Sequence, residues 1–123
     1  MDAAIKTALD KDRLVDITTT GRKTGRHHRK EVAFDYVDGK VYLSGRPGPR
    51  SWYANLLANP DFTFHFKQSL QRDVSARATP ITEKAQRRRV FGRFKAEEQR
   101  MNTMDVEAWT AGSPLVEVEI RKG

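Results

Sequence analysis

The sequence of 123 residues contains no cysteine, and this absence removes several kinds of chemistry at once. A chain without cysteine forms no disulfide scaffold, no thiolate zinc site and no cysteine nucleophile. Any redox chemistry must therefore come from a bound cofactor.

Long hydrophobic runs are also missing. No apolar stretch approaches the roughly 18 residues of a membrane span, and the first residues lack the basic-then-apolar order of a signal peptide. We therefore expect a cytoplasmic protein with no membrane span. The sequence shows no internal repeat, linker or low-complexity segment, so residues 1–123 are expected to form a single domain.

The charge that is present is unevenly placed. The 23 Lys and Arg outnumber the 16 Asp and Glu, which gives a formal net charge of +7. Residues 21–30 carry five cations and no acid, residues 84–95 form a second basic cluster around 87–89, and residues 97–119 hold six acids against one Arg. A basic surface implies an anionic partner, which could be nucleic acid, an acidic lipid surface, or a small molecule with phosphate or carboxylate groups.

Six segments have the pattern of strands. Residues 14–20 are rich in β-branched side chains, and residues 31–37 and 40–44 flank Asp38-Gly39, a strong hairpin signal. Residues 61–66 alternate Phe with polar residues, residues 71–79 are expected to pair with them, and residues 114–120 alternate again. Short strands joined by hairpins, with helices at the ends, indicate an antiparallel barrel of the α+β class.

Short helices are expected between these strands. Residues 2–13 suit a polar helix or arm, and Ser51 is expected to cap a helix that ends near residue 59. Thr82 is expected to cap a third helix that runs to about residue 95, with Ala85 facing inward and the arginines facing outward. A short fourth piece is expected around residues 105–109, stopping at Gly112.

The segment 18–25, TTTGRKTG, is the first candidate for binding chemistry, because it places hydroxyls, two glycines, Arg22 and Lys23 at a strand end. Glycine lets backbone N–H groups approach an oxyanion, and Arg and Lys supply charge and donors. The glycine spacing of a Walker phosphate loop is absent. The segment is therefore either an anion-binding loop or a solvated basic turn.

Other candidates carry less chemistry. Adjacent His27 and His28 point to opposite faces of an extended strand and have no partner at a metal-ligand spacing, so no metal site is expected. His65 is expected to face outward. The sequence shows no recognisable Ser-His-Asp triad, so no catalytic residue is assigned. Ser44 closes a strand, where it either donates to a ligand or caps a turn. Trp52 and Tyr53 either stack on a planar ring or pack into the barrel mouth.

In combination, TTGRKTG at 19–25, YVDG at 36–39, WYANL at 52–56 and ANP at 58–60 resemble the deazaflavin-dependent nitroreductase and quinone reductase family. The resemblance covers residues 14–79 clearly and extends loosely to the last strand. It implies a split β-barrel, an FMN-binding-like antiparallel six-stranded barrel with short flanking helices. It also implies hydride transfer from reduced coenzyme F420 to a quinone, nitro compound or similar electron-poor small molecule, with the protein binding, orienting and excluding water.

The same resemblance implies roles for individual residues. F420 carries a phosphate and a polyglutamate tail, which Arg22, Lys23 and Thr24 would hold while Gly25 allows close backbone approach. Ser44 and Gly45 would border the deazaflavin ring, and Trp52, Tyr53 and Asn55 would support the ring or its ribityl chain.

The chain departs from the family pattern at three places. Relatives carry an Arg and a Pro where this chain has His28 and Glu31. Arg29 is available in place of the missing Arg, so His28 and Arg29 both join the expected cofactor-binding set. Relatives that reduce bulky nitro compounds have pocket-lining tyrosines before the last Trp, whereas this chain has Arg100, Thr103 and Val106 before Trp109.

Two alternatives remain open from the sequence. Split barrels accept several planar ligands, so FMN or haem could replace F420. A basic rim with Phe62, Phe64 and Phe66 as stacking platforms would suit single-stranded nucleic acid. Three Phe on one face of an alternating strand are more simply core, so no nucleic-acid partner is expected. Split barrels commonly pair to complete their cofactor sites, which is compatible with a homodimer.

Overall fold

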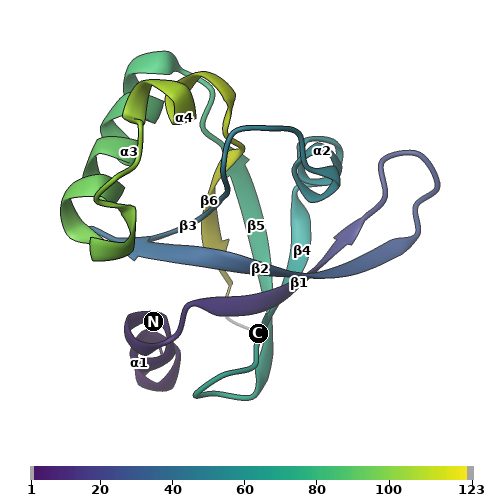
Figure 1. Cartoon of the computed structure of the whole chain (residues 1–123). Coiled ribbons are helices and arrows are strands. Elements are labelled where there is room, and N and C mark those ends of the chain that lie inside the picture. The colour runs from purple at the N-terminus through teal and green to yellow at the C-terminus, as the bar shows by residue number, and fades with distance from the viewer. Residues whose placement is uncertain (1, 122–123) are drawn as a thin grey trace.

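Six antiparallel strands close into a barrel in the computed structural model, which describes residues 2–121 (Figure 1). The order around the barrel is β1-β2-β3-β6-β5-β4. The antiparallel barrel predicted from the strand patterns is confirmed. The strands are β1 (Leu14–Thr20), β2 (His27–Val37), β3 (Lys40–Ser44), β4 (Asp61–Phe66), β5 (Arg72–Pro80) and β6 (Leu115–Ile120).

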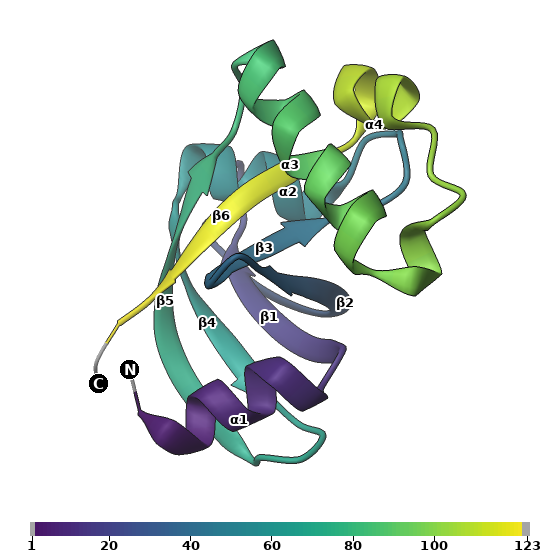
Figure 2. The ribbon, with the colours of Figure 1, turned by 90° about the vertical axis from the view of Figure 1, so that its left-hand side faces the viewer.

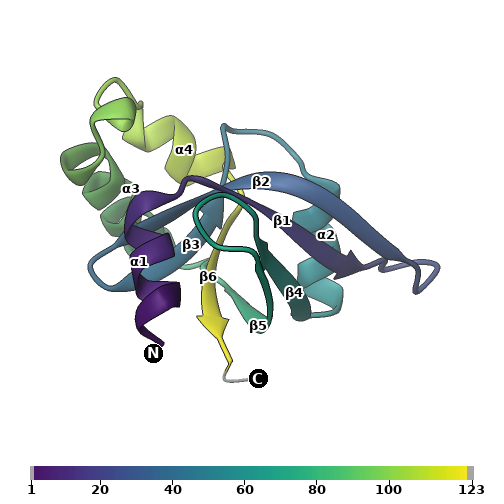
Figure 3. The same cartoon turned by 90° about the horizontal axis from the view of Figure 1, so that it is seen from below.

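The β1–β2 hairpin extends beyond the barrel wall. Thr20 at the end of β1 pairs with His27, so β2 begins four residues before the predicted start at residue 31. The first five residues of β2 are all exposed, and they carry no hydrophobic alternation that could have predicted them. The tip of the hairpin projects away from the barrel (Figures 1 and 3).

The β2–β3 hairpin turns at the predicted position. Asp38 and Gly39 have φ angles of 55° and 73°, the two left-handed residues that a type I′ turn requires. Phe34 pairs with Leu43 and Val37 with Lys40, which confirms that the two strands are antiparallel neighbours.

The barrel interior is the main core. Phe62, Phe64 and Phe66 all point into it, and the ring centroids of Phe34 and Phe64 meet edge to face at 5.9 Å. Helix α1 (Ala3–Lys11) closes one end of the barrel, as Figure 2 shows, and adds Leu9 to the same core. Helix α2 (Ser51–Ala58) contributes Trp52 and Leu56.

A second core lies outside the barrel, beneath a layer of helices. This layer consists of α3 (Lys84–Glu97), the short 3-10 helix η1 (Gln99–Met101) and α4 (Val106–Gly112). Tyr42 on β3 meets Phe94 on α3 with ring centroids 5.4 Å apart, and Phe91 meets Trp109 at 5.7 Å. The helix layer therefore covers the outer face of β2, β3 and β6 at one side of the barrel (Figure 2).

Two predicted helix caps are wrong. Arg50, not Ser51, is the N-cap residue of α2, and it makes no side-chain capping bond. Glu83, not Thr82, caps α3, because its carboxylate accepts from the backbone N–H groups of Ala85 and Gln86. A carboxylate can satisfy two free N–H groups at once and also complements the positive end of the helix.

Two predicted side-chain orientations on α3 are wrong, and His65 is buried although it lies on the predicted face of β4, opposite the inward Phe residues. Ala85 on α3 is exposed, whereas Arg87 is buried and only 8% exposed. His65 is 6% exposed, since it lies between the hydroxyl of Thr18 and the carboxylate of Asp73, each 2.7 Å from a ring nitrogen. Polar partners across neighbouring strands explain the burial of His65, and sequence alternation alone does not identify them.

Within residues 2–121, no helix has both the length and the apolar character that a membrane crossing demands. The same part of the chain holds no group of three or more His, Cys, Asp or Glu placed to bind a metal ion.

Candidate functional site

The loop at the tip of the β1–β2 hairpin is closed by its own backbone. The N–H of Gly21 donates to the carbonyl of Arg26 at 2.7 Å, and the N–H of Gly25 donates to the carbonyl of Gly21 at 3.1 Å. Gly25 has a φ of +73°, a conformation that glycine adopts without strain. The hydroxyl of Thr24 accepts from the N–H of Arg26 at 3.3 Å, so Arg22 and Lys23 lie on an ordered turn.

Asn55 on α2 ties this turn to the barrel. Its side-chain oxygen accepts from the backbone N–H of Arg22 at 3.2 Å and from the guanidinium of Arg22 at 3.0 Å. Its amide nitrogen donates to the hydroxyl of Thr19 at 3.2 Å. Asn55 is 4% exposed, so it positions Arg22 from beneath.

A cavity of about 340 Å³ lies between the hairpin and α2, and we call it the hairpin cavity. It brings together seven of the eleven predicted binding residues. Gly25 is not among its lining residues, and neither is Tyr53. The lining consists of Thr19, Gly21, Arg22, Lys23, Thr24, His28, Arg29, Lys30, Ser51, Trp52 and Asn55.

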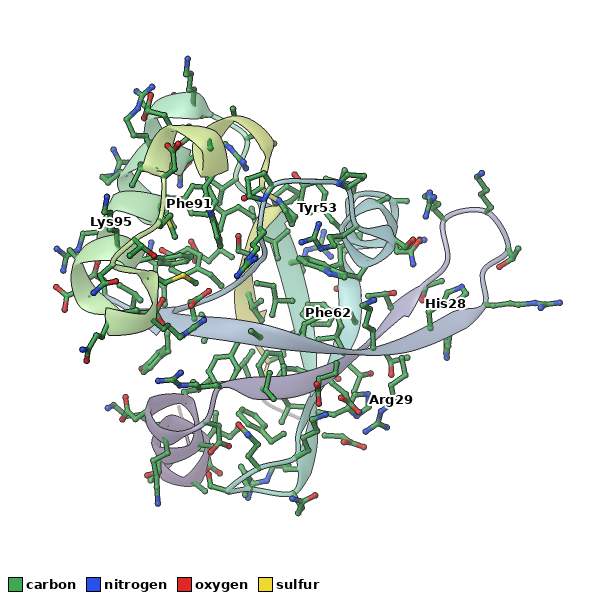
Figure 4. All side chains as sticks on the ribbon, viewed as in Figure 1. His28, Arg29, Tyr53, Phe62, Phe91 and Lys95 are labelled. Atoms are coloured by element: carbon green, nitrogen blue, oxygen red, sulfur yellow. The ribbon has the colours of Figure 1, made fainter. Side chains whose placement is uncertain are left out.

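The side chains around the hairpin cavity differ in how far they are already engaged. Figure 4 shows His28 and Arg29 on opposite sides of β2, and the guanidinium of Arg29 donates to the Asp16 carboxylate at 3.0 Å. Lys23, Arg26 and Lys30 form no ion pair with any residue between 2 and 121. Several positive charges near this cavity therefore lack a protein counter-ion, which favours an anionic ligand.

The aromatic residues of α2 are packed against each other. Trp52 is 4% exposed, and its ring meets the ring of Tyr53 edge to face with centroids 6.1 Å apart. Trp52 lines the hairpin cavity, whereas Tyr53 is half-buried against the barrel core. Of the two predicted aromatic contacts, Trp52 is thus the one placed at the cavity.

Ser44 and Gly45 lie in a different cavity of about 470 Å³, between the barrel and the helix layer. We call it the helix-layer cavity, and it shares no lining residue with the hairpin cavity. The hydroxyl of Ser44 donates to the carbonyl of Pro114 at 2.6 Å. The other lining residues are Ala33, Asp35, Arg46, Pro47, Arg100, Met101, Thr103, Met104, Asp105 and Trp109.

Asp35 in this second cavity was not expected from the sequence. It lies on β2, it is 3% exposed, and its carboxylate accepts from the Arg100 guanidinium at 2.5 Å. Burial raises the pKa of Asp35 to about 8, with a further contribution from the neighbouring carboxyl of Glu98, while Arg100 opposes the rise. Two sequence features could have pointed to this pair: Asp35 lies between two aromatic residues of a strand, and Arg100 is the only Arg in the acidic stretch 97–119.

The arrangement combines two kinds of site. The hairpin cavity offers cations and a tryptophan wall, which suit a planar anionic molecule. The helix-layer cavity offers a buried carboxyl whose pKa is raised by burial, which suits proton transfer to a small molecule.

The model of the F420H(2)-dependent quinone reductase family matches residues 1–111. No curated protein matches the chain by sequence.

Several solved structures share the fold. A conserved hypothetical protein from Mycobacterium tuberculosis superposes with a TM-score of 0.70 and 19% identity, covering 99% of this chain and 82% of that one. A FAD-binding protein from Mesorhizobium loti has a TM-score of 0.68 and 15% identity, with coverages of 99% and 91%. The haem storage protein HutZ from Vibrio cholerae has a TM-score of 0.71 and 12% identity, with coverages of 99% and 91%. At these identities the likeness supports the flavin-binding split-barrel fold.

Proposed function

The chain belongs to the F420H(2)-dependent quinone reductase family, and on that basis we propose that it reduces a quinone, nitro compound or similar electron-poor small molecule. Family membership makes it a deazaflavin-dependent oxidoreductase. When bound, reduced F420 supplies the hydride, so the chain must hold the cofactor, orient it against the acceptor and exclude water.

The hairpin cavity is the observation that carries this proposal. Asn55 holds the Arg22 guanidinium in place before any ligand binds, and Lys23 has no acidic partner within residues 2–121. The phosphate and carboxylates of F420 match such a set, because preorganised guanidinium and ammonium groups form charge-assisted hydrogen bonds with oxyanions. The residues present therefore fit the anionic part of the cofactor.

We assign the remaining predicted residues by their places in the structure. Thr24, Gly25 and His28 lie on the hairpin beside Arg22 and Lys23, and Arg29 joins them while it stays paired with Asp16. Ser44 and Gly45 line the helix-layer cavity, and we propose that the deazaflavin ring borders them and meets the acceptor in this cavity. Trp52 forms a wall of the hairpin cavity, and Tyr53 and Asn55 support that wall and the turn.

The nucleic-acid alternative loses its stacking platform in the structure. Phe62, Phe64 and Phe66 are buried in the barrel, with exposures of 7%, 0% and 2%, and cannot stack on bases. FMN and haem remain as alternative planar ligands, and the absorption spectrum of freshly purified protein distinguishes them from F420.

Titration of the purified protein with F420, followed by deazaflavin fluorescence and tryptophan emission, tests the proposal. We expect saturable binding that weakens about 10- to 150-fold in Lys23→Ala, because a charge-assisted contact contributes ~1.5–3 kcal/mol. Lys95→Ala is the matched control, since Lys95 is an exposed lysine on α3, on the other side of the molecule from His28 (Figure 4).

Two results would count against this assignment. No saturable change with the wild-type protein would contradict F420 binding. Equal affinities for Lys23→Ala and Lys95→Ala would remove Lys23 from the binding site while leaving the cofactor assignment in place.

A further inference from the structure

Three charged side chains meet between β2 and the helix layer. The Arg100 guanidinium donates to Asp35 Oδ1 at 2.5 Å and to Glu98 Oε1 at 3.3 Å. Glu98 Oε2 is buried and has no hydrogen-bond partner among residues 2–121. Two carboxylates thus share one cation, and one carboxylate oxygen remains unsatisfied.

Such a cluster is stabilised by a proton. With both acids ionised it would carry a buried net negative charge, which is costly at low dielectric. A proton on Asp35 removes this charge, and the raised pKa of Asp35 has this origin: burial first, then Glu98. Other titratable groups near Asp35 are its cross-strand partner Tyr42, and Arg46 and Asp105 on the cavity wall.

The cluster also lies between two openings. Asp35 and Arg100 line the helix-layer cavity. Arg100 and Glu98 line a separate groove of about 330 Å³ that runs beside the end of α1, next to Asp10 and Asp12. The cluster therefore has its Glu98 end at this groove and its Asp35 end at the helix-layer cavity.

We propose that Asp35 is the proton donor for an acceptor bound in the helix-layer cavity, and that Glu98 and the groove resupply the proton. This inference rests on the proposed function. It gives the chain a catalytic acid, which the sequence alone did not indicate.

The reaction balances with one proton from Asp35. A quinone that accepts a hydride gains two electrons and one hydrogen nucleus, and becomes a hydroquinone monoanion. The O–H bond of the Asp35 carboxyl then breaks, and its proton bonds to the remaining phenolate oxygen, which gives the neutral hydroquinone. Bound reduced F420 would supply the hydride and one further proton, which water would take up, and water returns one proton to the Asp35 carboxylate.

The first test needs no cofactor. Carbon NMR of protein labelled at the carboxyl carbons of Asp and Glu should show a resonance that titrates near pH 8 and disappears in Asp35→Asn. Glu98→Gln should move this midpoint to lower pH, because a like charge beside Asp35 is removed. An Asp35 resonance that titrates near pH 4, as exposed Asp does, would overturn the proposal.

The second test is a single turnover with a water-soluble benzoquinone mixed with protein carrying reduced F420. We expect Asp35→Asn to bind F420 normally and to reduce the quinone about 100-fold more slowly or worse, as for loss of a general acid. The wild-type rate should fall above pH 8, and Glu98→Gln should shift that fall to lower pH. Asp61→Asn, an exposed acid on β4, should leave rate and pH profile unchanged.

The outcomes separate the two proposals. Normal F420 binding with a wild-type rate and pH profile in Asp35→Asn would overturn the role of Asp35 alone. Failure of the wild-type protein to bind F420 would overturn the proposed function, and the role of Asp35 with it.

Discussion

Arg87 joins α3 to α4, and we expect its replacement to destabilise the helix layer. Its guanidinium donates to four backbone carbonyls: Thr110 at 2.8 Å, Ile81 at 2.9 Å, Ser113 at 2.5 Å and Trp109 at 3.3 Å. The carbonyls of Thr110 and Ser113 lie in the last turn of α4 and at its C-cap, where backbone C=O groups lack helical partners, whereas the Trp109 carbonyl also accepts from the N–H of Ser113 at 2.9 Å. A cation at this end also complements the helix dipole.

The size of the effect follows from burial. Arg87 is 8% exposed and forms no ion pair among residues 2–121, so the carbonyls are its only described polar partners. Arg87→Met keeps most of the aliphatic stem but leaves several buried carbonyls without a donor, each worth about 1–3 kcal/mol. Removing the buried charge offsets part of the cost of the unpaired carbonyls. We therefore expect the free energy of unfolding to fall by about 3–5 kcal/mol, from the total of about 5–15 kcal/mol that is typical of a domain.

Urea unfolding followed by tryptophan fluorescence measures this loss. For a slope of about 2 kcal/mol per molar, the midpoint of Arg87→Met should fall by about 2 M. Arg87→Lys should also lose stability, because one ammonium cannot reach all of these carbonyls. Arg88→Met is the matched control, since the neighbouring Arg88 is solvent-exposed and paired with Glu107, and it should lose much less. Equal midpoints for Arg87→Met and Arg88→Met would refute the reasoning.

Two further predictions concern the cavities. Asp35 is protonated in the folded protein up to about pH 8 but ionises near pH 4 when unfolded. Wild-type stability should therefore fall from pH 4 to pH 8 relative to Asp35→Asn, as urea midpoints at several pH values would show. Asn55→Ala should lose about 1–3 kcal/mol and bind F420 more weakly, because Arg22 and Thr19 lose their buried partner. Asn59→Ala, which loses one 3.4 Å bond, is the control for both unfolding and F420 titration.

Much of the barrel follows from local sequence signals. The β2–β3 hairpin needed only Asp38-Gly39 between two apolar segments, and the alternating Phe of residues 61–66 fixed the face that β4 turns inward. These signals are local, because a turn type and a strand face depend on neighbours along the chain. The start of β2 was missed since its first residues are exposed and pair only with β1.

The unexpected buried polar residues have partners on other elements of the fold. Arg87 is buried because carbonyls more than 20 residues away meet its guanidinium. His65 is buried because Thr18 and Asp73 lie on the two strands beside β4. Asp35 is buried next to Arg100, 65 residues away. A helix or strand period gives the expected direction of a side chain, but it contains no information on these contacts.

The candidate site likewise contains residues that a local motif predicts and residues whose place depends on tertiary packing. Arg22, Lys23 and Thr24 are adjacent in sequence, so their common place at the hairpin cavity could be predicted from the motif. Ser44 and Gly45 were assigned to the same cofactor through the resemblance, and the structure places them in a separate cavity. Which residues complete that second cavity depends on how the helix layer packs on the barrel, which no local motif determines.

The ion pairs show which of the cations behind the net charge of +7 are neutralised within the protein and which are not. In the basic cluster of residues 84–95, Arg87 stabilises α4, Arg88 pairs with Glu107, and Arg93 pairs with Asp38 and Glu97. None of the cations of that cluster lines either cavity. At the hairpin, by contrast, Lys23 and Lys30 line a cavity and have no acidic partner within residues 2–121. The positive potential that an anionic cofactor meets is therefore concentrated at the hairpin, within about one screening length of 8–10 Å at ordinary salt.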